Sequence, residues 1–179
     1  MVAYSFKPAF AADILAGGKR QTIRQPRGGR GRHARVNDGL QLYTGMRTRQ
    51  CCKLGDALCT EVREVVLDFA AGRVTLDDAV EITGLRELDA FATADGFGVE
   101  TEAATHGLVW CLMRRWWWIT HPGQPVFLGV LIGWGETFRP MESAVTVPET
   151  SMERKSLSRT GLKVSGPERV ANNALREPA

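Results

Sequence analysis

The sequence predicts an α+β fold, a small β-barrel with two or three flanking helices, followed by a disordered C-terminal tail. Short segments in which apolar and polar residues alternate recur along the chain, and a period of two is typical of strands. Two stretches in the second half carry apolar residues three and four positions apart, the spacing of a helix. After Trp134 no apolar period is sustained. We therefore place the domain at residues 1–134 and a polar tail, with at most a short helix near residues 167–175, at residues 135–179.

The N-terminal part predicts a strand, a helix, a turn and a second extended segment. Apolar residues alternate over residues 2–6, which predicts a strand with one apolar face. Pro8 suits the first turn of a helix, because its missing N–H is not needed there. Gly17 and Gly18 end that helix, since glycine adopts the left-handed C-cap conformation at low cost. Lys19 therefore leaves the helix through a turn, and an extended segment starts at Thr22.

The remaining elements follow from the same patterns. Asp38 and Gly39 form a turn signal. We expect strands at residues 40–43, 57–67, 73–76 and 126–134, and helices at residues 85–95 and 108–119. Trp116, Trp117 and Trp118 are consecutive and cannot all face one side of a helix. We therefore expect at least one of them to be partly exposed or to line a pocket.

The most unusual stretch of the chain is strongly basic. It contains seven basic residues and no acidic one: Lys19, Arg20, Arg24, Arg27, Arg30, Arg32 and Arg35. Several unpaired cations cannot share an apolar core, so they must face water, a polyanion or a phosphate-bearing ligand. Glycines interleave the arginines, a composition that favours flexible contact with nucleic acid over a merely solvated loop. The net charge of the whole chain is only +3, so the evidence lies in the distribution.

Other features of the composition argue against several classes of protein. No apolar run approaches the ~20 residues that a membrane span needs, and the N-terminus lacks a signal-peptide pattern, so we expect a soluble, cytoplasmic protein. The four cysteines form neither a CxxC pair nor a disulfide framework, which predicts reduced thiols. His33, His106 and His121 do not have the spacing of metal ligands. We therefore expect no metal and no cofactor.

Residues 14–24, ILAGGKRQTIR, resemble the GxKxxTxR signature of the ASCH domain (activating-signal-cointegrator homology), a member of the PUA-like superfamily. The strand and helix before the signature, the Asp38-Gly39 turn and the strand at 126–134 fit the same family, so the resemblance covers residues 1–134. It implies a PUA-like β-barrel. The cleft beside the signature would bind RNA or a nucleotide-like ligand.

The family includes a small bacterial acetylcytidine amidohydrolase, and the resemblance to it implies three catalytic residues. Lys19 and Thr22 match its motif directly, and its glutamate aligns with Asp95. The chemistry is sensible, because amide hydrolysis needs an activated nucleophile and a threonine hydroxyl is poor until a base takes its proton. Lysine can be that base if its pKa is lowered, which the neighbours Arg20 and Arg24 favour. A carboxylate could then deliver a proton to the leaving amine.

The sequence leaves two main functions open. The first is a nucleic-acid-binding domain, RNA-directed, whose basic run contacts phosphates; the second is an amidohydrolase acting on an acylated cytidine-type nucleoside. Cleavage of RNA ranks below both, because no histidine pair serves it. In an ordinary structural interpretation Lys19 binds phosphate, Thr22 holds the turn through a backbone bond and Asp95 caps a helix. The distinguishing feature is whether Asp95 comes within hydrogen-bonding distance of Lys19 and Thr22 in one cleft.

Overall fold

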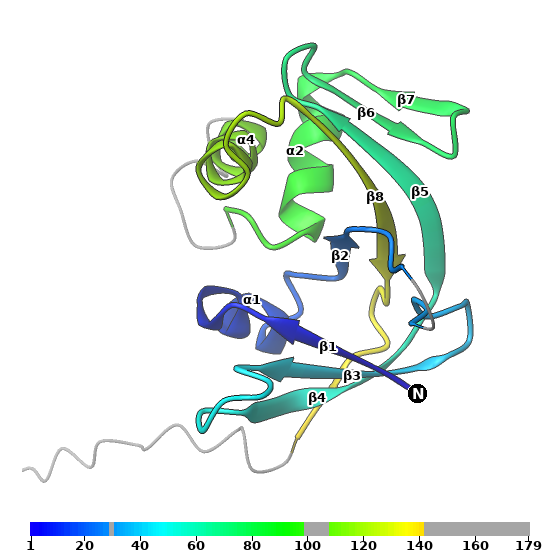
Figure 1. Ribbon diagram of the computed structural model, residues 1–179, viewed down its shortest axis with the longest axis vertical. Coiled ribbons are helices and arrows are strands. Elements are labelled where there is room, and N and C mark those ends of the chain that lie inside the picture. Colours follow the sequence, from blue (N-terminus) through cyan, green and yellow to red (C-terminus); the bar gives the residue numbers. More distant parts are fainter. Residues whose placement is uncertain (29–30, 99–107, 142–179) are drawn as a thin grey trace, which may run out of the picture. The chain divides into compact units, whose positions relative to one another are not determined.

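The computed structural model of the protein describes residues 1–28, 31–98 and 108–141 (Figure 1). The chain divides into two units, Met1–Val147 and Pro148–Ala179, and the second lies wholly outside the described residues. The predicted helix near residues 167–175 and the predicted disorder after residue 141 therefore fall on undescribed residues.

The first sheet has four strands in the order β1-β3-β4-β9. These are β1 (Val2–Phe6), β3 (Gly39–Thr44), β4 (Cys52–Leu58) and β9 (Arg139–Pro140). β1 and β3 are parallel, whereas β3–β4 and β4–β9 are antiparallel. β1 and β3 bury every second residue, as the alternation predicts.

The second sheet has five strands in the order β2-β8-β5-β6-β7, and all its neighbouring pairs are antiparallel. Its strands are β2 (Gln21–Arg24), β8 (Val126–Gly133), β5 (Glu61–Asp68), β6 (Arg73–Leu76) and β7 (Val80–Ile82). β2, which carries Thr22 and Arg24 of the signature, lies at one edge of the order and pairs only with β8 among the described strands. Thr22 is opposite Ile132 in that pairing.

The helices complete two hydrophobic cores. α2 (Leu85–Ala94) and α4 (Val109–Thr120) contact each other and cover one face of the second sheet (Figure 1). The 3₁₀ turn Pro8–Phe10 and α1 (Ala11–Leu15) adjoin the first sheet. Phe10 packs against both cores. The segment that carries Phe10 thus lies where the two cores meet.

The structure confirms the α+β class and most of the expected elements. It differs in that the described strands form two sheets that are not closed into a barrel. The strand expected at residues 57–67 is in fact two, β4 and β5, because the chain passes from one sheet to the other at Cys59 and Thr60. The backbone N–H of Cys59 bonds to Asp38 in the first sheet's turn, whereas that of Thr60 bonds to Gly133 in the second sheet.

The folded chain continues past the boundary expected at Trp134. The Thr137 hydroxyl bonds to the carbonyl of Leu58 at 2.9 Å, Phe138 packs against the first core, and β9 follows. The polar composition of this segment gives no sign that it is folded, because the residues that it contacts lie on β4 and are distant in sequence. β7, a short exposed strand, was likewise not expected.

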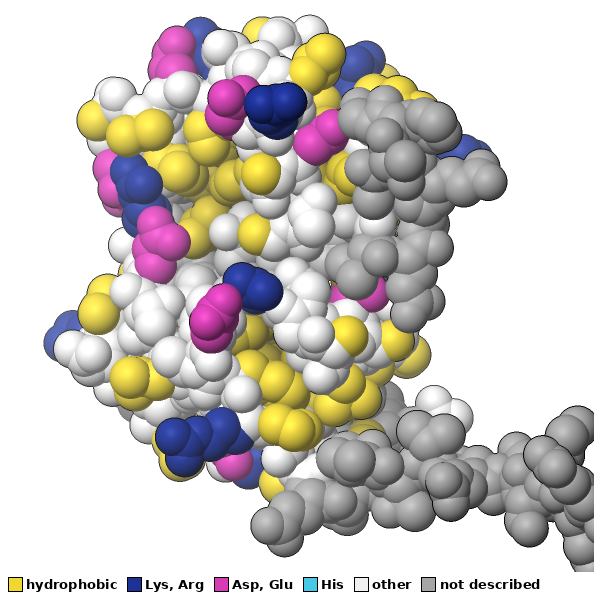
Figure 2. Space-filling view, turned by 180° about the vertical axis from the view of Figure 1, so that it is seen from behind, with side chains coloured by type: hydrophobic (Ala, Val, Ile, Leu, Met, Phe, Trp, Pro, Cys, Tyr) yellow, Lys and Arg dark blue, Asp and Glu magenta, His cyan; other side chains and the backbone are white. Residues whose placement is uncertain are grey.

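On the face seen from behind, several of the described Lys and Arg side chains lie close to Asp or Glu side chains (Figure 2). Several basic residues of the second sheet have such partners. Arg63 Nε lies 2.7 Å from Asp77, and Arg73 lies 3.2 Å from Glu81. Exposed pairs of this kind stabilise a fold little, but they neutralise the surface that they occupy.

Candidate functional site

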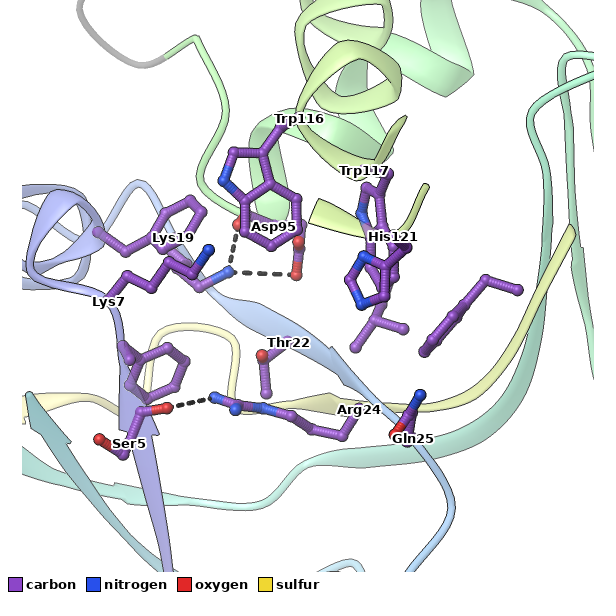
Figure 3. A pocket seen from close by; sticks show the side chains of 14 residues that line it. Ser5, Lys7, Lys19, Thr22, Arg24, Gln25, Asp95, Trp116, Trp117 and His121 are labelled. Atoms are coloured by element: carbon purple, nitrogen blue, oxygen red, sulfur yellow. Dashed lines mark hydrogen bonds and ion pairs between the residues drawn. The ribbon is translucent and has the colours of Figure 1, made fainter. Parts of the chain in front are cut away.

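A pocket of about 280 Å³ lies between the N-terminal segment, β2 and the ends of α2 and α4 (Figure 3). Lys19, Thr22, Arg24 and Asp95 all line it. The three residues proposed as catalytic therefore share one cavity, together with the arginine of the signature. Lys19, Thr22 and Asp95 are buried in the fold, with relative exposures of 2%, 4% and 6%.

The glycine turn of the signature aims Lys19 into the pocket. Gly17 has φ +73°, a left-handed conformation that glycine adopts readily, and it follows the last turn of α1. The backbone N–H groups of Gly18 and Lys19 then both donate to the carbonyl of Asp13, at 2.9 and 3.0 Å. These bonds hold the turn. β2 starts two residues later, so that Thr22 and Arg24, two positions apart, lie on the same side of the strand.

Lys19 and Asp95 form a buried ion pair in the wall of the pocket. Lys19 Nζ lies 3.2 Å from Asp95 Oδ1 and also donates to the backbone carbonyl of Asp95 (Figure 3). The ammonium lies 4.8 Å from the centroid of the Phe10 ring, a cation–π arrangement. Gly96 makes room for this contact, because a Cβ there would come within 2.8 Å of Lys19 Cδ.

Burial moves the two pKa values toward each other. Desolvation lowers the pKa of Lys19, against the opposing charge of Asp95. Desolvation also raises the pKa of Asp95, against the opposing effects of Lys19, Arg24 and the backbone N–H of Ile23. Both shifts favour the uncharged forms. The cost of moving the proton from the ammonium to the carboxylate is therefore smaller here than it would be in water.

Thr22 presents a hydroxyl that makes no hydrogen bond to any residue in the described part of the chain. The interpretation in which this hydroxyl holds the turn therefore lacks its backbone bond, and the bonds to Asp13 serve that purpose. A threonine oxygen at the wall of a pocket, with no competing partner, is available to a ligand or a reacting group.

Arg24 forms the floor of the pocket on the side away from Asp95. Its Nη2 donates to the backbone carbonyl of Ser5 at 2.9 Å, and its guanidinium lies 4.9 Å from the centroid of the Phe6 ring. Burial lowers its pKa, although the charge of Asp95 opposes that shift. Its Nε atom is buried with no hydrogen-bond partner among the described residues. Among the described residues its side chain therefore bonds to a backbone carbonyl and forms no ion pair with a carboxylate.

Aromatic side chains form the other wall of the pocket. The sequence predicted that at least one of the consecutive tryptophans would be partly exposed or would line a pocket, but it assigned none of them to this site. Trp116 and Trp117 belong to α4, and His121 is the residue that follows this helix. Phe127 belongs to β8. Trp118 points elsewhere and is 53% exposed. The run of three tryptophans was the available signal, since it required some of them to leave the core. Nothing in the sequence indicated that His121 belongs to a site, because the three histidines do not have the spacing of metal ligands.

Some of the other basic residues of the run at residues 19–35 form ion pairs with carboxylates, and others do not. Arg20 bonds to Glu136 at 3.2 Å and to the carbonyl of Gly17, and it does not line the pocket. Arg32 lies 2.6 Å from Asp38 and holds the pKa of that carboxyl to about 2.

The side chains of two arginines of the loop form no ion pair with a carboxylate among the described residues. Arg27 is exposed, bonds to the carbonyl of Arg32 at 2.8 Å and lies 5.3 Å from the centroid of the Tyr4 ring. Arg35 is exposed. Arg30 lies outside the described residues.

The described residues contain no group of three or more His, Cys, Asp or Glu side chains that could hold a metal ion. None of the described helices is long and apolar enough to cross a membrane. The four cysteines are free thiols, and only Cys59 is buried.

No protein-family model matches the chain, and no curated protein matches it. Among solved structures the chain is similar to ASCH from Zymomonas mobilis, at 12% identity over 76% of this chain and 65% of that one, with a TM-score of 0.39. This chain therefore spans less than two thirds of that protein. Two variants of the same protein match at 14% and 15% identity, over 78% of this chain and 73% and 71% of theirs, each with a TM-score of 0.40.

These likenesses are distant, with 12–15% identity and TM-scores of 0.39–0.40. A proposal about function therefore depends on the pocket of this chain.

Proposed function

We propose that this pocket hydrolyses the amide bond of an acylated aminopyrimidine nucleoside of the acetylcytidine type. The observation that carries the proposal is the ion pair of Lys19 and Asp95, 3.2 Å apart in a cavity that Thr22 also lines. Asp95 thus lies within hydrogen-bonding distance of Lys19, as the hydrolase interpretation requires. Thr22 shares the cavity but makes no hydrogen bond to Asp95 among the described contacts.

The first step is activation of Thr22. Transfer of the Lys19 proton to Asp95 leaves a neutral amine and a neutral acid, the pair that burial favours. The amine then accepts the hydroxyl proton of Thr22 while Oγ1 forms a bond to the acyl carbon. The electron pair of the carbonyl moves to its oxygen, and the positive charges of Lys19 and Arg24 stabilise the oxyanion.

The second step breaks the carbon–nitrogen bond. As the oxyanion re-forms the carbonyl, the bond to nitrogen breaks and Asp95 gives its proton to the leaving amine. The acyl group stays on Thr22 as an ester, and Asp95 is again a carboxylate beside protonated Lys19. Transfer of the Lys19 proton to Asp95 leaves the Lys19 amine neutral again, and this amine can then take a proton from water. The resulting hydroxide attacks the ester, the acid leaves, and the proton held by Lys19 returns to Thr22.

The size and the walls of the pocket favour a small, planar ligand. A volume of about 280 Å³ is at the lower end of the range of ligand pockets. Trp116 and Phe10 face it with aromatic rings whose centroids are 5.9 Å apart, and a pyrimidine can pack against such a wall. These features support a nucleoside as the ligand in preference to a long polymer.

The test is release of cytidine from acetylcytidine by the purified protein. We expect Thr22→Ala and Lys19→Ala each to reduce turnover about 10³-fold or more. Lys53→Ala is the matched control, because Lys53 forms an ion pair with Asp56 at 2.7 Å but does not line the pocket. Turnover that survives both pocket substitutions would contradict the proposal, as would its equal loss in the control.

Binding of RNA is the second candidate function, supported by the exposed arginines beside the pocket. Gln25 lines the pocket, and Arg27 follows two residues later with its guanidinium free of carboxylates in the described structure. A nucleotide in the pocket could thus continue as a strand along the loop toward Arg35. Each phosphate contact that is lost should reduce the salt dependence of binding by about one unit of slope.

RNA retention should therefore weaken with salt, and Arg27→Glu or Arg35→Glu should flatten that dependence. Arg86→Glu is the control, because Arg86 is exposed on α2 outside the basic loop. Binding that is insensitive to salt, or an equal effect of the control, would remove this candidate.

A further inference from the structure

His121 occupies a defined position in the wall of the pocket. It follows the last residue of α4, and its ring stacks on Trp117 with centroids 4.5 Å apart and planes at 25°. Phe127 packs against the same ring at 5.6 Å. Figure 3 shows the imidazole beside Trp117, on the side of the pocket opposite Lys19. Two aromatic neighbours thus hold the plane of the ring.

The hydrogen bonds of Thr120 determine which ring nitrogen of His121 carries the hydrogen. The Thr120 hydroxyl lies 2.8 Å from the carbonyl oxygen of Trp116 and 3.4 Å from that of Trp117. A carbonyl only accepts, so the single hydroxyl hydrogen is donated there, as is common for threonine in helices. The hydroxyl oxygen also lies 2.9 Å from His121 Nδ1. It can only accept in that contact, and Nδ1 must therefore carry a hydrogen.

A neutral imidazole with its hydrogen on Nδ1 has a lone pair on Nε2. In the described part of the chain Nε2 has no hydrogen-bond partner. The negatively charged acceptor of the pocket, the Asp95 carboxylate, is already paired with Lys19. His121 therefore supplies an acceptor that no described protein group uses.

We infer that His121 Nε2 accepts a hydrogen bond from the amide N–H of the ligand, and so makes the pocket specific for secondary amides. The inference rests on the proposed function, because it assumes an acylated aminopyrimidine. In such a base the ring carbonyl and the unsubstituted ring nitrogen are acceptors, whereas the amide N–H is the donor. Lys19 and Arg24 provide donors to the pocket, and His121 provides the complementary acceptor. His121 is thus a specificity-determining residue, and Thr120 is the positioning residue that selects its tautomer.

The experiment compares acetylcytidine with its analogue methylated on the amide nitrogen, which lacks the N–H. Binding is measured by quenching of tryptophan fluorescence, which does not require turnover, and kcat/KM is measured alongside. We expect the natural chain to prefer the N–H compound about tenfold, the effect of one hydrogen bond. His121→Phe keeps an aromatic ring of similar size and removes the acceptor, and in it we expect the preference to fall to within about twofold.

A purely steric preference would survive in His121→Phe, because the ring still fills the wall, and this result would overturn the inference. Equal weakening of both compounds would also overturn it. Thr120→Val and Thr120→Ser provide a second test that leaves the ring in place. The serine variant should retain both the preference and the Nδ1–H tautomer seen by ¹⁵N NMR, and the valine variant should lose part of each. A natural chain with its hydrogen on Nε2 would contradict the inference directly.

The outcomes separate this inference from the hydrolase proposal. Binding with the expected preference but without turnover would overturn the hydrolase proposal and support the role of His121. Turnover with an unchanged preference in His121→Phe would overturn the role of His121 alone. Failure of the natural chain to bind either compound would overturn both.

Discussion

Replacement of Asp95 by asparagine should destabilise the protein. The substitution preserves shape but removes the carboxylate 3.2 Å from the Lys19 ammonium, which is only 2% exposed. Removal of one partner from a buried ion pair costs about 3–5 kcal/mol, because the other charge is left without compensation. Here acceptors survive, since Lys19 also donates to the backbone carbonyl of residue 95 and asparagine keeps an amide oxygen, and the Phe10 ring stays close. We therefore expect the lower end of that range, about 3 kcal/mol at neutral pH.

The loss of stability in Asp95→Asn should also depend on pH, and it should become smaller as pH rises. Burial lowers the pKa of Lys19 and Asp95 opposes that shift, so the pKa falls further in Asp95→Asn. Between the folded pKa and the ordinary value of about 10.4, the unfolded chain then binds more protons than the folded chain. The free energy of unfolding therefore rises with pH across this window. Below the folded pKa the penalty is complete, and above about pH 10.4 it disappears.

Urea unfolding of the natural chain and of Asp95→Asn, at about pH 6 and about pH 9, measures both effects. Asp56→Asn is the control, because its ion pair with Lys53 is more exposed and should contribute no more than about 1 kcal/mol. A loss below about 1 kcal/mol in Asp95→Asn would refute the burial argument. The same would follow if its stability did not rise with pH relative to the control.

Two further predictions concern a glycine and an exposed ion pair. Gly96→Ala should cost more than Gly72→Ala in the free energy of unfolding, by about 1 kcal/mol or more. Both glycines have positive φ, but a Cβ at Gly96 meets Lys19 whereas one at Gly72 meets nothing within 4 Å, so equal losses would contradict the close approach. Arg32→Ala should raise the pKa of Asp38 from about 2 toward its ordinary value, measured by NMR titration of the carboxyl. Because the folded pKa is lowered, this pair stabilises the fold above the unfolded pKa and is lost as pH falls toward 2; an unchanged titration in Arg32→Ala would show that Arg32 is not the cause.

The sequence by itself determined the local elements and one side of the pocket. The α+β class, the glycine turn and the helices at residues 85–95 and 108–119 all follow from patterns within a few residues. Lys19, Thr22 and Arg24 could be predicted together because one turn and one strand carry them. Asp95 was brought to them by family resemblance and not by any local pattern, since it lies 76 residues from Lys19.

Only the tertiary structure decided how the pocket is completed and which cations stay available. That Trp116, Trp117 and His121 line this particular pocket follows only from the packing of the end of α4 against β2. Arg20 pairs with Glu136, which lies 116 residues further along the chain. The basic run alone therefore could not predict that the charge of Arg20 is neutralised. Periodicity reports which face of an element is apolar, but desolvation and charge pairing depend on neighbours in space, and those neighbours come from distant segments of the chain.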